Sequence, residues 1–261
     1  MKILVIGDSC TDVYIYGTAN RLCPDAPVPI LIPIKTVESG GMASNVYANI
    51  LSLGIECNLI TNAERVVKTR YVDEKTNQMI VRVDTGEFGL TECDNNAIYS
   101  KKDGGEVNYE EYDAVIISDY NKGFLTYRHI EYISTQHPLT FLDTKKIISP
   151  QFDKITFFKI NQHEYAKNTE SWKATSTFPS NIESRFIVTH AGDGCVYNST
   201  WYTVDVVPIK DNSGAGDSFL AGLVVDYIKT NDIEKSIVFA NKCATKVVQQ
   251  RGITTVGEFL K

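Results

Sequence analysis

The strongest constraint on the fold of this chain is the alternation of short apolar runs with stretches of helical length. The runs Ile3–Ile6, Ala114–Ser118 and Phe186–Thr189 contain few polar residues, as expected for strands buried on both faces of a parallel sheet. The two longest helical patterns cover Gly214–Lys229 and Ile233–Gln250. Strands that alternate with helices in this way predict an α/β domain with a mostly parallel central sheet.

The other predicted elements mostly continue this pattern. Further strands are expected at Ile55–Ile60, Leu139–Leu142, Ile155–Ile160 and Cys195–Tyr197, and further helices at Met42–Leu53, Tyr127–Gln136 and Gln162–Asn168. Gly86–Tyr109 gives no clear pattern, and Thr169–Ser184, with Trp172 and Pro179, is predicted to be irregular. Residues 12–17 and 65–84 alternate polar and apolar side chains, and 28–37 is also extended, which indicates strands with one solvated face. We expect a single domain over residues 1–261, with these strands projecting from an α/β body.

The overall charge narrows the possible partners. Lys and Arg number 26 against 32 Asp and Glu, which gives a net charge of −6. An acidic protein is a poor match for nucleic acid or an anionic membrane, although a local group of cations can hold a small phosphorylated ligand. No apolar run approaches the ~18 residues of a membrane span, and the N-terminal run is too short for a signal peptide. Six scattered cysteines predict free thiols in a reducing, cytoplasmic compartment.

The segment Asp211–Ser218 is the strongest candidate for a functional site, because a turn of small residues opens there into a long apolar helix. Glycines let backbone N–H groups approach an anion, and a helix N-terminus carries about half a positive charge. Asp217, in the first turn, could take the proton of an attacking hydroxyl. The alternative is an ordinary helix start, with Ser213 as its N-cap. The sequence has no Walker A pattern, and no G-x-G-x-x-G follows the first strand.

Three motifs in the same order resemble those of the ribokinase (PfkB) superfamily. Asp211–Asp217 is similar to its D-x-x-G-A-G-D signature, Gly40–Asn45 to its G-G-x-x-x-N sugar motif, and Asn161–Glu164 to its N-x-x-E motif. The resemblance implies a ribokinase-like three-layer sandwich with a small β lid formed by about 12–17, 28–37 and 65–84. It also implies a sugar kinase that uses ATP and Mg²⁺. Because lids of this family commonly pair, it further implies a homodimer through the lid strands.

A narrower resemblance is to the heptose 7-phosphate kinases, and it rests on residues 7–8, 12–17, 21–29, 66–84, 118–123 and 240–241. It implies transfer of the ATP γ-phosphate to the anomeric hydroxyl of D-glycero-D-manno-heptose 7-phosphate, a step of ADP-heptose and lipopolysaccharide synthesis. Such kinases are often the N-terminal half of a bifunctional enzyme; without the nucleotidyltransferase half, adenylyl transfer is not expected here. The family has roughly 30 further residues between the positions of Ile60 and Arg65, and Thr169–Ser184 is also shortened.

The resemblance assigns roles on the sugar side of the site. Asp217 is then the general base, and the backbone N–H groups of Ala215, Gly216 and Asp217 form an anion hole. Gly214 is a further catalytic residue at the start of the helix. Asp12 and Asn45 would contact sugar hydroxyls, with Gly40 and Gly41 allowing a close approach. The simpler explanation is a solvated charge for Asp12, a helix cap for Asn45 and a plain turn for the two glycines. The cations for the substrate phosphate would be Arg21, Arg70 and Lys122, with Lys145 as a further candidate, although each alone is as well explained by an exposed charge.

On the nucleotide side, the residues implied to bind ATP are Asn161, Thr189, Gly192, Gly194, Asp211 and Asn241. Glu164 would hold Mg²⁺ through water, and its alternative is a first-turn helix acid. Two other functions stay open. One is the same chemistry on a ribose- or fructose-like sugar. The other is a catalytically weak binding or regulatory protein, suggested by the shortened body, although such a protein would not need the carboxylate of Asp217.

Overall fold

The body of the protein is built around one eight-stranded sheet in the order β12-β11-β10-β9-β8-β7-β1-β4. The structure is a computed structural model that describes residues 1–87, 89–176 and 181–259. Six strands from β4 to β10 run parallel, and β11 and β12 add an antiparallel edge. The strands are β1 (Lys2–Gly7), β4 (Glu56–Thr61), β7 (Ala114–Asp119), β8 (Thr140–Thr144), β9 (Phe157–Asn161), β10 (Phe186–Thr189), β11 (Cys195–Tyr197) and β12 (Thr200–Tyr202).

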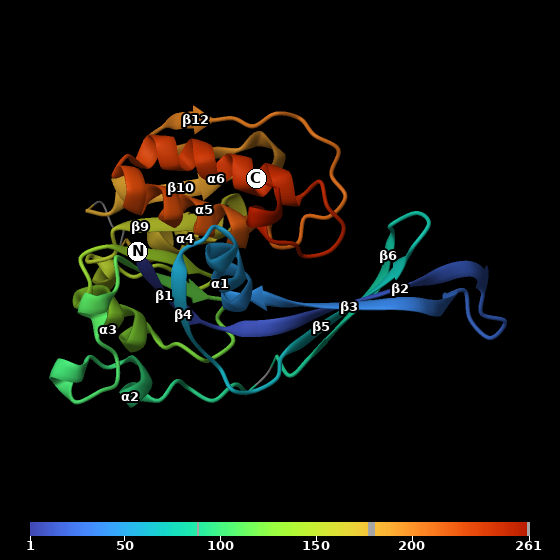
Figure 1. The fold of residues 1–261 in the computed structure, drawn as a ribbon, viewed down its shortest axis with the longest axis horizontal. Coiled ribbons are helices and arrows are strands. Elements are labelled where there is room, and N and C mark those ends of the chain that lie inside the picture. The colour runs from blue at the N-terminus through green and yellow to red at the C-terminus, as the bar shows by residue number, and fades with distance from the viewer. Residues whose placement is uncertain (88, 177–180, 260–261) are drawn as a thin grey trace.

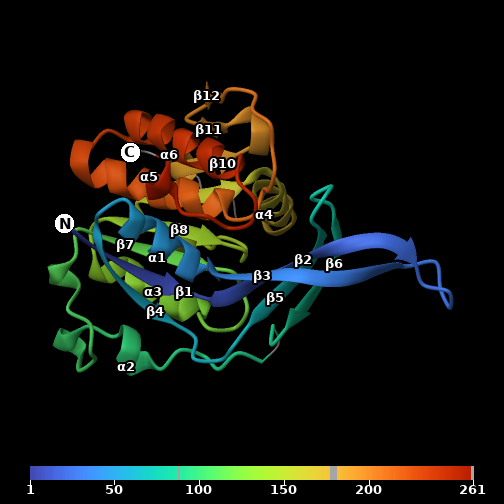
Figure 2. The same cartoon turned by 45° about the vertical axis from the view of Figure 1, so that its right-hand side comes forward.

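Helices cover both faces of this sheet and complete the predicted three layers (Figures 1 and 2). On one face lie α1 (Ala43–Ser52), α5 (Ala215–Thr230) and α6 (Ile233–Val247); on the other lie α3 (Tyr127–Gln136) and α4 (Gln162–Thr175), with the short α2 (Asn95–Ile98) beside α3. Successive side chains of a strand point to opposite faces. Ile3 and Val5 of β1 therefore pack in the core under α1 and α5, while Leu4 and Ile6 pack in the core under α3 and α4.

A second sheet of four strands forms the projecting lid, in the order β3-β2-β5-β6. Its strands are β2 (Ser9–Leu22), β3 (Pro29–Met42), β5 (Val67–Asp73) and β6 (Met79–Thr85). Figure 1 shows these strands extending away from the body, with the turn between β2 and β3 at the far end. The predicted lid segments are confirmed as strands, and β2 and β3 are longer than expected. Only residues 62–66 separate β4 from β5. The edge strand β4 of the large sheet therefore leads almost directly into the lid.

The prediction of an irregular segment at Thr169–Ser184 is wrong in its first part, because α4 continues to Thr175. The helix is held by a buried anchor near its end: Trp172 is 2% exposed, and its Nε1 donates to the backbone oxygen of Ile148 over 3.0 Å. Pro179 lies outside the described residues. The other differences are small: α6 ends at Val247, and β12 was not predicted. The described residues of Gly86–Tyr109 include α2 and a 3-10 turn at Lys101–Asp103.

The structure bears on the expectations for the cysteines and for membrane-spanning helices. All six cysteines are free thiols, and five of them are buried. Burial raises the pKa of the Cys57 and Cys195 thiols to about 12, so these groups stay protonated at neutral pH. Among the helices that the structure describes, none has the length and apolar character needed to cross a lipid bilayer.

Candidate active site

The start of α5 has an exposed set of backbone donors. Gly214 is the N-cap residue and adopts φ 77°, and no side chain caps this end of the helix. The interpretation of Ser213 as N-cap is therefore wrong: the Ser213 N–H instead donates to Asp211 Oδ1 over 2.8 Å, which holds the turn before the helix. The uncapped N–H groups and the helix dipole make this turn suitable for binding an anion.

Asp217 lies one turn into the helix, with its carboxylate enclosed in the protein. The residue is 5% exposed, and each of its oxygens accepts one hydrogen bond, Oδ1 from Tyr120 Oη over 2.6 Å and Oδ2 from Asn45 Nδ2 over 2.8 Å. Burial raises the pKa of Asp217, while these two hydrogen bonds and the nearby Lys159 ammonium act to lower it. A carboxylate whose pKa is raised by burial is a stronger base than one in water, so Asp217 is suited to accept a proton from an alcohol.

Asn45 connects α1 to this carboxylate. Its Nδ2 donates to Asp217, and its Oδ1 accepts from Asn49 Nδ2 over 3.0 Å, so both ends of the amide are occupied. The glycine at 214 is needed for this contact, because a Cβ there would lie 2.6 Å from Asn45 Nδ2. The expected role of Asn45 in contacting a sugar hydroxyl stays a prediction; the contact that the structure contains holds the carboxylate of Asp217 in place.

Gly40 and Gly41, which come before α1, likewise let neighbouring side chains approach the backbone closely, here on the lid side of the site. A Cβ at Gly41 would lie 1.9 Å from Asp12 Oδ2, and one at Gly40 would lie 3.1 Å from Ser44 Cβ. Asp12 is 3% exposed and forms an ion pair with Arg70. Burial acts against the charge of Arg70, but the hydrogen bond and charge of Asp12 raise its pKa above the ordinary value. The two residues expected to bind hydroxyl and phosphate are thus paired with each other.

The lid brings further cations to the same side. Lys68 pairs in register with Asp12 across β2 and β5, and Arg70 lies two positions on, so the three residues share one face of the lid. Lys122 lies beside this face and forms an ion pair with Glu87 at 2.8 Å. Arg21, in contrast, is exposed near the far end of β2 and does not join these residues within one chain (Figure 1).

On the other side of the α5 start is a cavity of about 350 Å³. Four of the predicted nucleotide-binding residues line it: Thr189, Gly192, Gly194 and Asn241. The helix start contributes Ala215 and Gly216 to the same wall, so the donors of the anion hole border this cavity. Asp211 is not in the lining, although its neighbour Asn212 is. The Asn241 Nδ2 donates to the Tyr202 backbone oxygen over 2.8 Å, which fixes the amide at the cavity wall.

Asn161 and Glu164 form a capping box at the start of α4. The Glu164 N–H donates to Asn161 Oδ1 over 2.9 Å, the Asn161 N–H donates to Glu164 Oε2 over 2.8 Å, and Lys145 pairs with Glu164 Oε1. These residues border a second hollow of about 330 Å³. Within the described residues, no three His, Cys, Asp or Glu side chains converge as a metal cage. One carboxylate beside a hollow fits Mg²⁺ held through water, since this ion keeps several water ligands.

Sequence reasoning missed four residues that the structure brings to the site. Tyr120 lies within residues 118–123, which resemble the heptose 7-phosphate kinases, but this resemblance did not assign it a role. Lys159 donates to Asp143 over 2.6 Å, and both are nearly inaccessible beneath the α5 start. A charged residue inside the otherwise apolar run of β9 is the signal that could have revealed Lys159. Lys68 could have been found from its position two residues before Arg70 on a strand.

A model of the pfkB family carbohydrate kinases matches residues 68–258 of the chain. The bifunctional protein HldE of Helicobacter acinonychis is 28% identical over 295 residues, which cover 96% of this chain and 63% of that protein. HldE of Helicobacter pylori strain HPAG1 is 29% identical over 302 residues, with the same two shares. The chain thus spans less than two thirds of the length of these relatives. Both alignments are longer than its 261 residues, so the relatives carry residues that this chain lacks.

Solved structures of ribokinase type superimpose on most of the chain. The ribokinase of Thermotoga maritima gives a TM-score of 0.69 at 15% identity and covers 96% of this chain and 94% of its own. Phosphofructokinase-2 from Escherichia coli, in complex with substrates and products, gives 0.69 at 12% identity, with shares of 99% and 96%. Arabidopsis thaliana ribokinase, complexed with ribose and ATP, gives 0.64 at 13% identity, with shares of 97% and 94%. These likenesses show that the fold is ribokinase-like.

Proposed function

The chain belongs to the pfkB family of carbohydrate kinases, and we propose that it transfers the γ-phosphate of ATP to the anomeric hydroxyl of D-glycero-D-manno-heptose 7-phosphate. The observation that carries this proposal is the position of the α5 start. Its N–H groups border the cavity on one side, and Asp217 meets Tyr120 and Asn45 on the other. A nucleotide in the cavity would then present its terminal phosphate to the N–H groups beside the base.

The proposed reaction uses groups of this chain in three ways. Asp217 accepts the proton of the sugar hydroxyl as that oxygen attacks the γ-phosphorus. The N–H groups of the α5 start bind the equatorial oxygens of the phosphoryl group, where negative charge is spread in the transition state. Lys159, which lies under Gly216, adds a positive charge close to the same point. Mg²⁺ held through water by Glu164 would neutralise charge on the nucleotide phosphates.

The choice of a heptose phosphate rests on two kinds of support. The relatives named HldE match almost the whole chain, although the chain covers only 63% of them. In addition, the lid contributes cations near the site: Lys68 Nζ lies 5.7 Å from the centroid of the Tyr120 ring, and Arg70 shares the same face of the lid. A substrate that already carries a phosphate needs such cations, whereas ribose or fructose does not.

The experiment is a panel of sugars assayed for ATP consumption with Mg²⁺. We expect turnover with heptose 7-phosphate, giving the 1,7-bisphosphate, and much lower kcat/KM with unphosphorylated heptose, ribose and fructose. Turnover only with unphosphorylated sugars would reject the heptose phosphate while leaving a sugar kinase. Nucleotide binding without turnover on any sugar would favour a regulatory protein. The matched control is Asp217→Asn, which should bind nucleotide but consume it ~10²–10⁴ times more slowly.

The lid also supports a proposal on assembly: that two chains pair through their lid strands. The lid has two open edges, β3 and β6, and exposed apolar side chains lie along both, with Ile34 at 59% and Val81 at 48% exposure. Unpaired strand edges and exposed apolar faces are the surfaces that a second sheet covers. The partner proposed for this surface is a second copy of the chain.

A further inference from the structure

Among the residues that the structure describes, Lys68 stands out from the other cations of the site because no carboxylate lies within hydrogen-bond distance of its ammonium. Its side chain is 14% exposed, and the hydrogen-bond acceptor it meets among the described residues is the thioether sulfur of Met42 at 3.5 Å. A thioether is a weak acceptor, and a largely buried ammonium without a good partner is costly. The nearest carboxylate, Glu87, lies 3.7 Å away, beyond hydrogen-bond distance.

Glu87 is shared between two lysines. Its Oε2 accepts from Lys122 Nζ at 2.8 Å, while Oε1 faces Lys68 Nζ at the longer distance. The neighbouring cations each have a carboxylate to themselves: Arg70 pairs with Asp12, and Lys145 pairs with Glu164. The group formed by Lys68, Lys122 and Glu87 therefore carries one positive charge more than its single carboxylate balances. We call these three residues the lysine pair and its counter-ion.

The lysine pair lies close to the reacting centre but separate from the nucleotide cavity. Lys68 Nζ is 5.7 Å from the centroid of the Tyr120 ring, and the hydroxyl of that ring donates to Asp217. One tyrosine ring thus separates the base from the nearer lysine. Neither lysine lines the cavity beside the α5 start. An anion held here would belong to the molecule whose hydroxyl meets Asp217, at a point remote from that hydroxyl.

The counter-ion is a weaker partner for two lysines than a phosphate would be. Glu87 follows β6 directly after Gly86, and its carboxylate lies within 4 Å of both Lys68 and Lys122. A carboxylate is a singly charged anion, whereas a phosphate brings up to two charges and three acceptor oxygens, so it would satisfy both lysines better.

We propose that Lys68 and Lys122 bind the phosphate of the sugar substrate, and that Glu87 holds them in its absence and gives way when it binds. The identity of the ligand as a sugar phosphate rests on the proposed function; the anion site itself does not. This assignment supplies the strong acceptor that Lys68 does not meet among the described residues. It also makes Glu87 a competitor of the substrate rather than one of its ligands.

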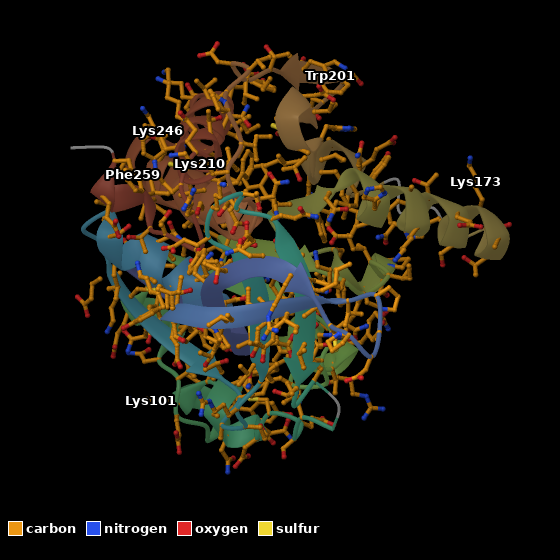
Figure 3. The ribbon with its side chains drawn as sticks, turned by 90° about the vertical axis from the view of Figure 1, so that its right-hand side faces the viewer. Lys101, Lys173, Trp201, Lys210, Lys246 and Phe259 are labelled. Carbon is orange, nitrogen blue, oxygen red and sulfur yellow. The ribbon has the colours of Figure 1, made fainter. Side chains whose placement is uncertain are left out.

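The test compares Lys68→Met, Lys122→Met and Glu87→Gln with the wild type. Each lysine variant should raise KM for heptose 7-phosphate about tenfold to hundredfold, as expected for a lost hydrogen bond to a charged group, with KM for ATP changed less than twofold. Glu87→Gln should lower KM for the sugar phosphate. The control is Lys102→Met, which breaks an ion pair with Glu110 at a remote surface and should change neither constant. Figure 3 shows its neighbour Lys101 at the lower left of the molecule.

A binding measurement separates this inference from the proposed function. With a non-hydrolysable ATP analogue filling the nucleotide side, inorganic phosphate should raise the melting temperature of the wild type. The rise should be lost in Lys68→Met and larger in Glu87→Gln. If the enzyme turned over only unphosphorylated sugars but kept this pattern, the proposed substrate would fail and the anion site would stand. An active heptose phosphate kinase in which Lys68→Met leaves the sugar-phosphate KM unchanged, or in which Glu87→Gln raises it, would overturn the inference alone.

Discussion

The hydroxyl of Tyr120 donates a hydrogen bond of 2.6 Å to Oδ1 of Asp217, across 97 residues of sequence. Tyr120 follows β7 and Asp217 lies in the first turns of α5, so the bond joins the sheet to the helix at the reacting centre. The Tyr120 backbone N–H donates in turn to Asp8 Oδ2 over 2.6 Å, which fixes the residue at the end of the neighbouring strand β1. Tyr120 is therefore a positioning residue for the base.

Tyr120→Phe should shift the pH profile of the reaction. The hydrogen bond from Tyr120 lowers the pKa of Asp217, so its removal raises that pKa, and the base stays protonated to a higher pH. We expect the acid limb of kcat/KM to move to higher pH and kcat to fall about tenfold at neutral pH, the effect of losing one charge-assisted hydrogen bond. The same measurement on Tyr127→Phe, a half-exposed tyrosine outside the site, should match the wild type. A purely structural role for Tyr120 would lower activity without moving the limb.

Asp217→Asn should separate activity from stability. Loss of the base is expected to reduce kcat by ~10²–10⁴ while nucleotide binding survives. Burial gives Asp217 a raised pKa, so the folded state binds its proton more tightly than the unfolded state, and stability falls as pH rises through that pKa. The amide removes this cost. Thermal denaturation near neutral pH should therefore show a melting temperature for Asp217→Asn that is equal to or above that of the wild type. A variant with full kcat would remove the base assignment.

Ala244→Phe should block the nucleotide without touching the sugar side. Ala244 projects from α6 into the cavity of about 350 Å³, opposite Gly192 and Gly194. A benzyl group there occupies space that the base of ATP would need, so KM for ATP should rise more than tenfold, while binding of the sugar phosphate is retained. Lys242→Ala is the control, because this exposed residue lies on the same helix but outside the cavity lining. Equal KM for ATP in both variants would show that the nucleotide binds elsewhere.

The sequence predicted elements and motifs well where the signal is local. A few adjacent residues are enough to predict β1 and β7, because each is an apolar run. The same is true of the start of α5, which follows a turn of small residues. Contacts between distant segments were not accessible in this way. The pairing of Tyr120 with Asp217, and of Lys122 with Glu87, depends on how β7, the lid and α5 come together. The register between β2 and β5, which sets Lys68 opposite Asp12, is likewise fixed by packing and not by either strand alone.

For two residues, the motif predicted a ligand contact but not the contacts that the side chain makes within the protein. Asn45 was predicted from its motif to contact the sugar, and the structure shows its amide joined to Asp217 and Asn49. Glu164 was predicted to hold Mg²⁺, and the structure shows it capping α4 and paired with Lys145. In both cases the functional and the structural explanations apply to the same atoms. A side chain that is already held in place by the fold loses less entropy when a ligand binds.

Val81→Glu should separate the proposed dimer into single chains. Val81 and Val83 are 48% and 43% exposed on one face of β6, the edge strand of the lid, and Val81 pairs in register with Tyr71 of β5 on that face. A carboxylate here would be buried against the second lid without a partner, which costs several kcal/mol. Light scattering should therefore give the mass of a dimer for the wild type and of a monomer for Val81→Glu. Val238→Glu, at a site of similar exposure on α6, should remain dimeric. A wild type that stays monomeric at high concentration would show that the lid has no such partner.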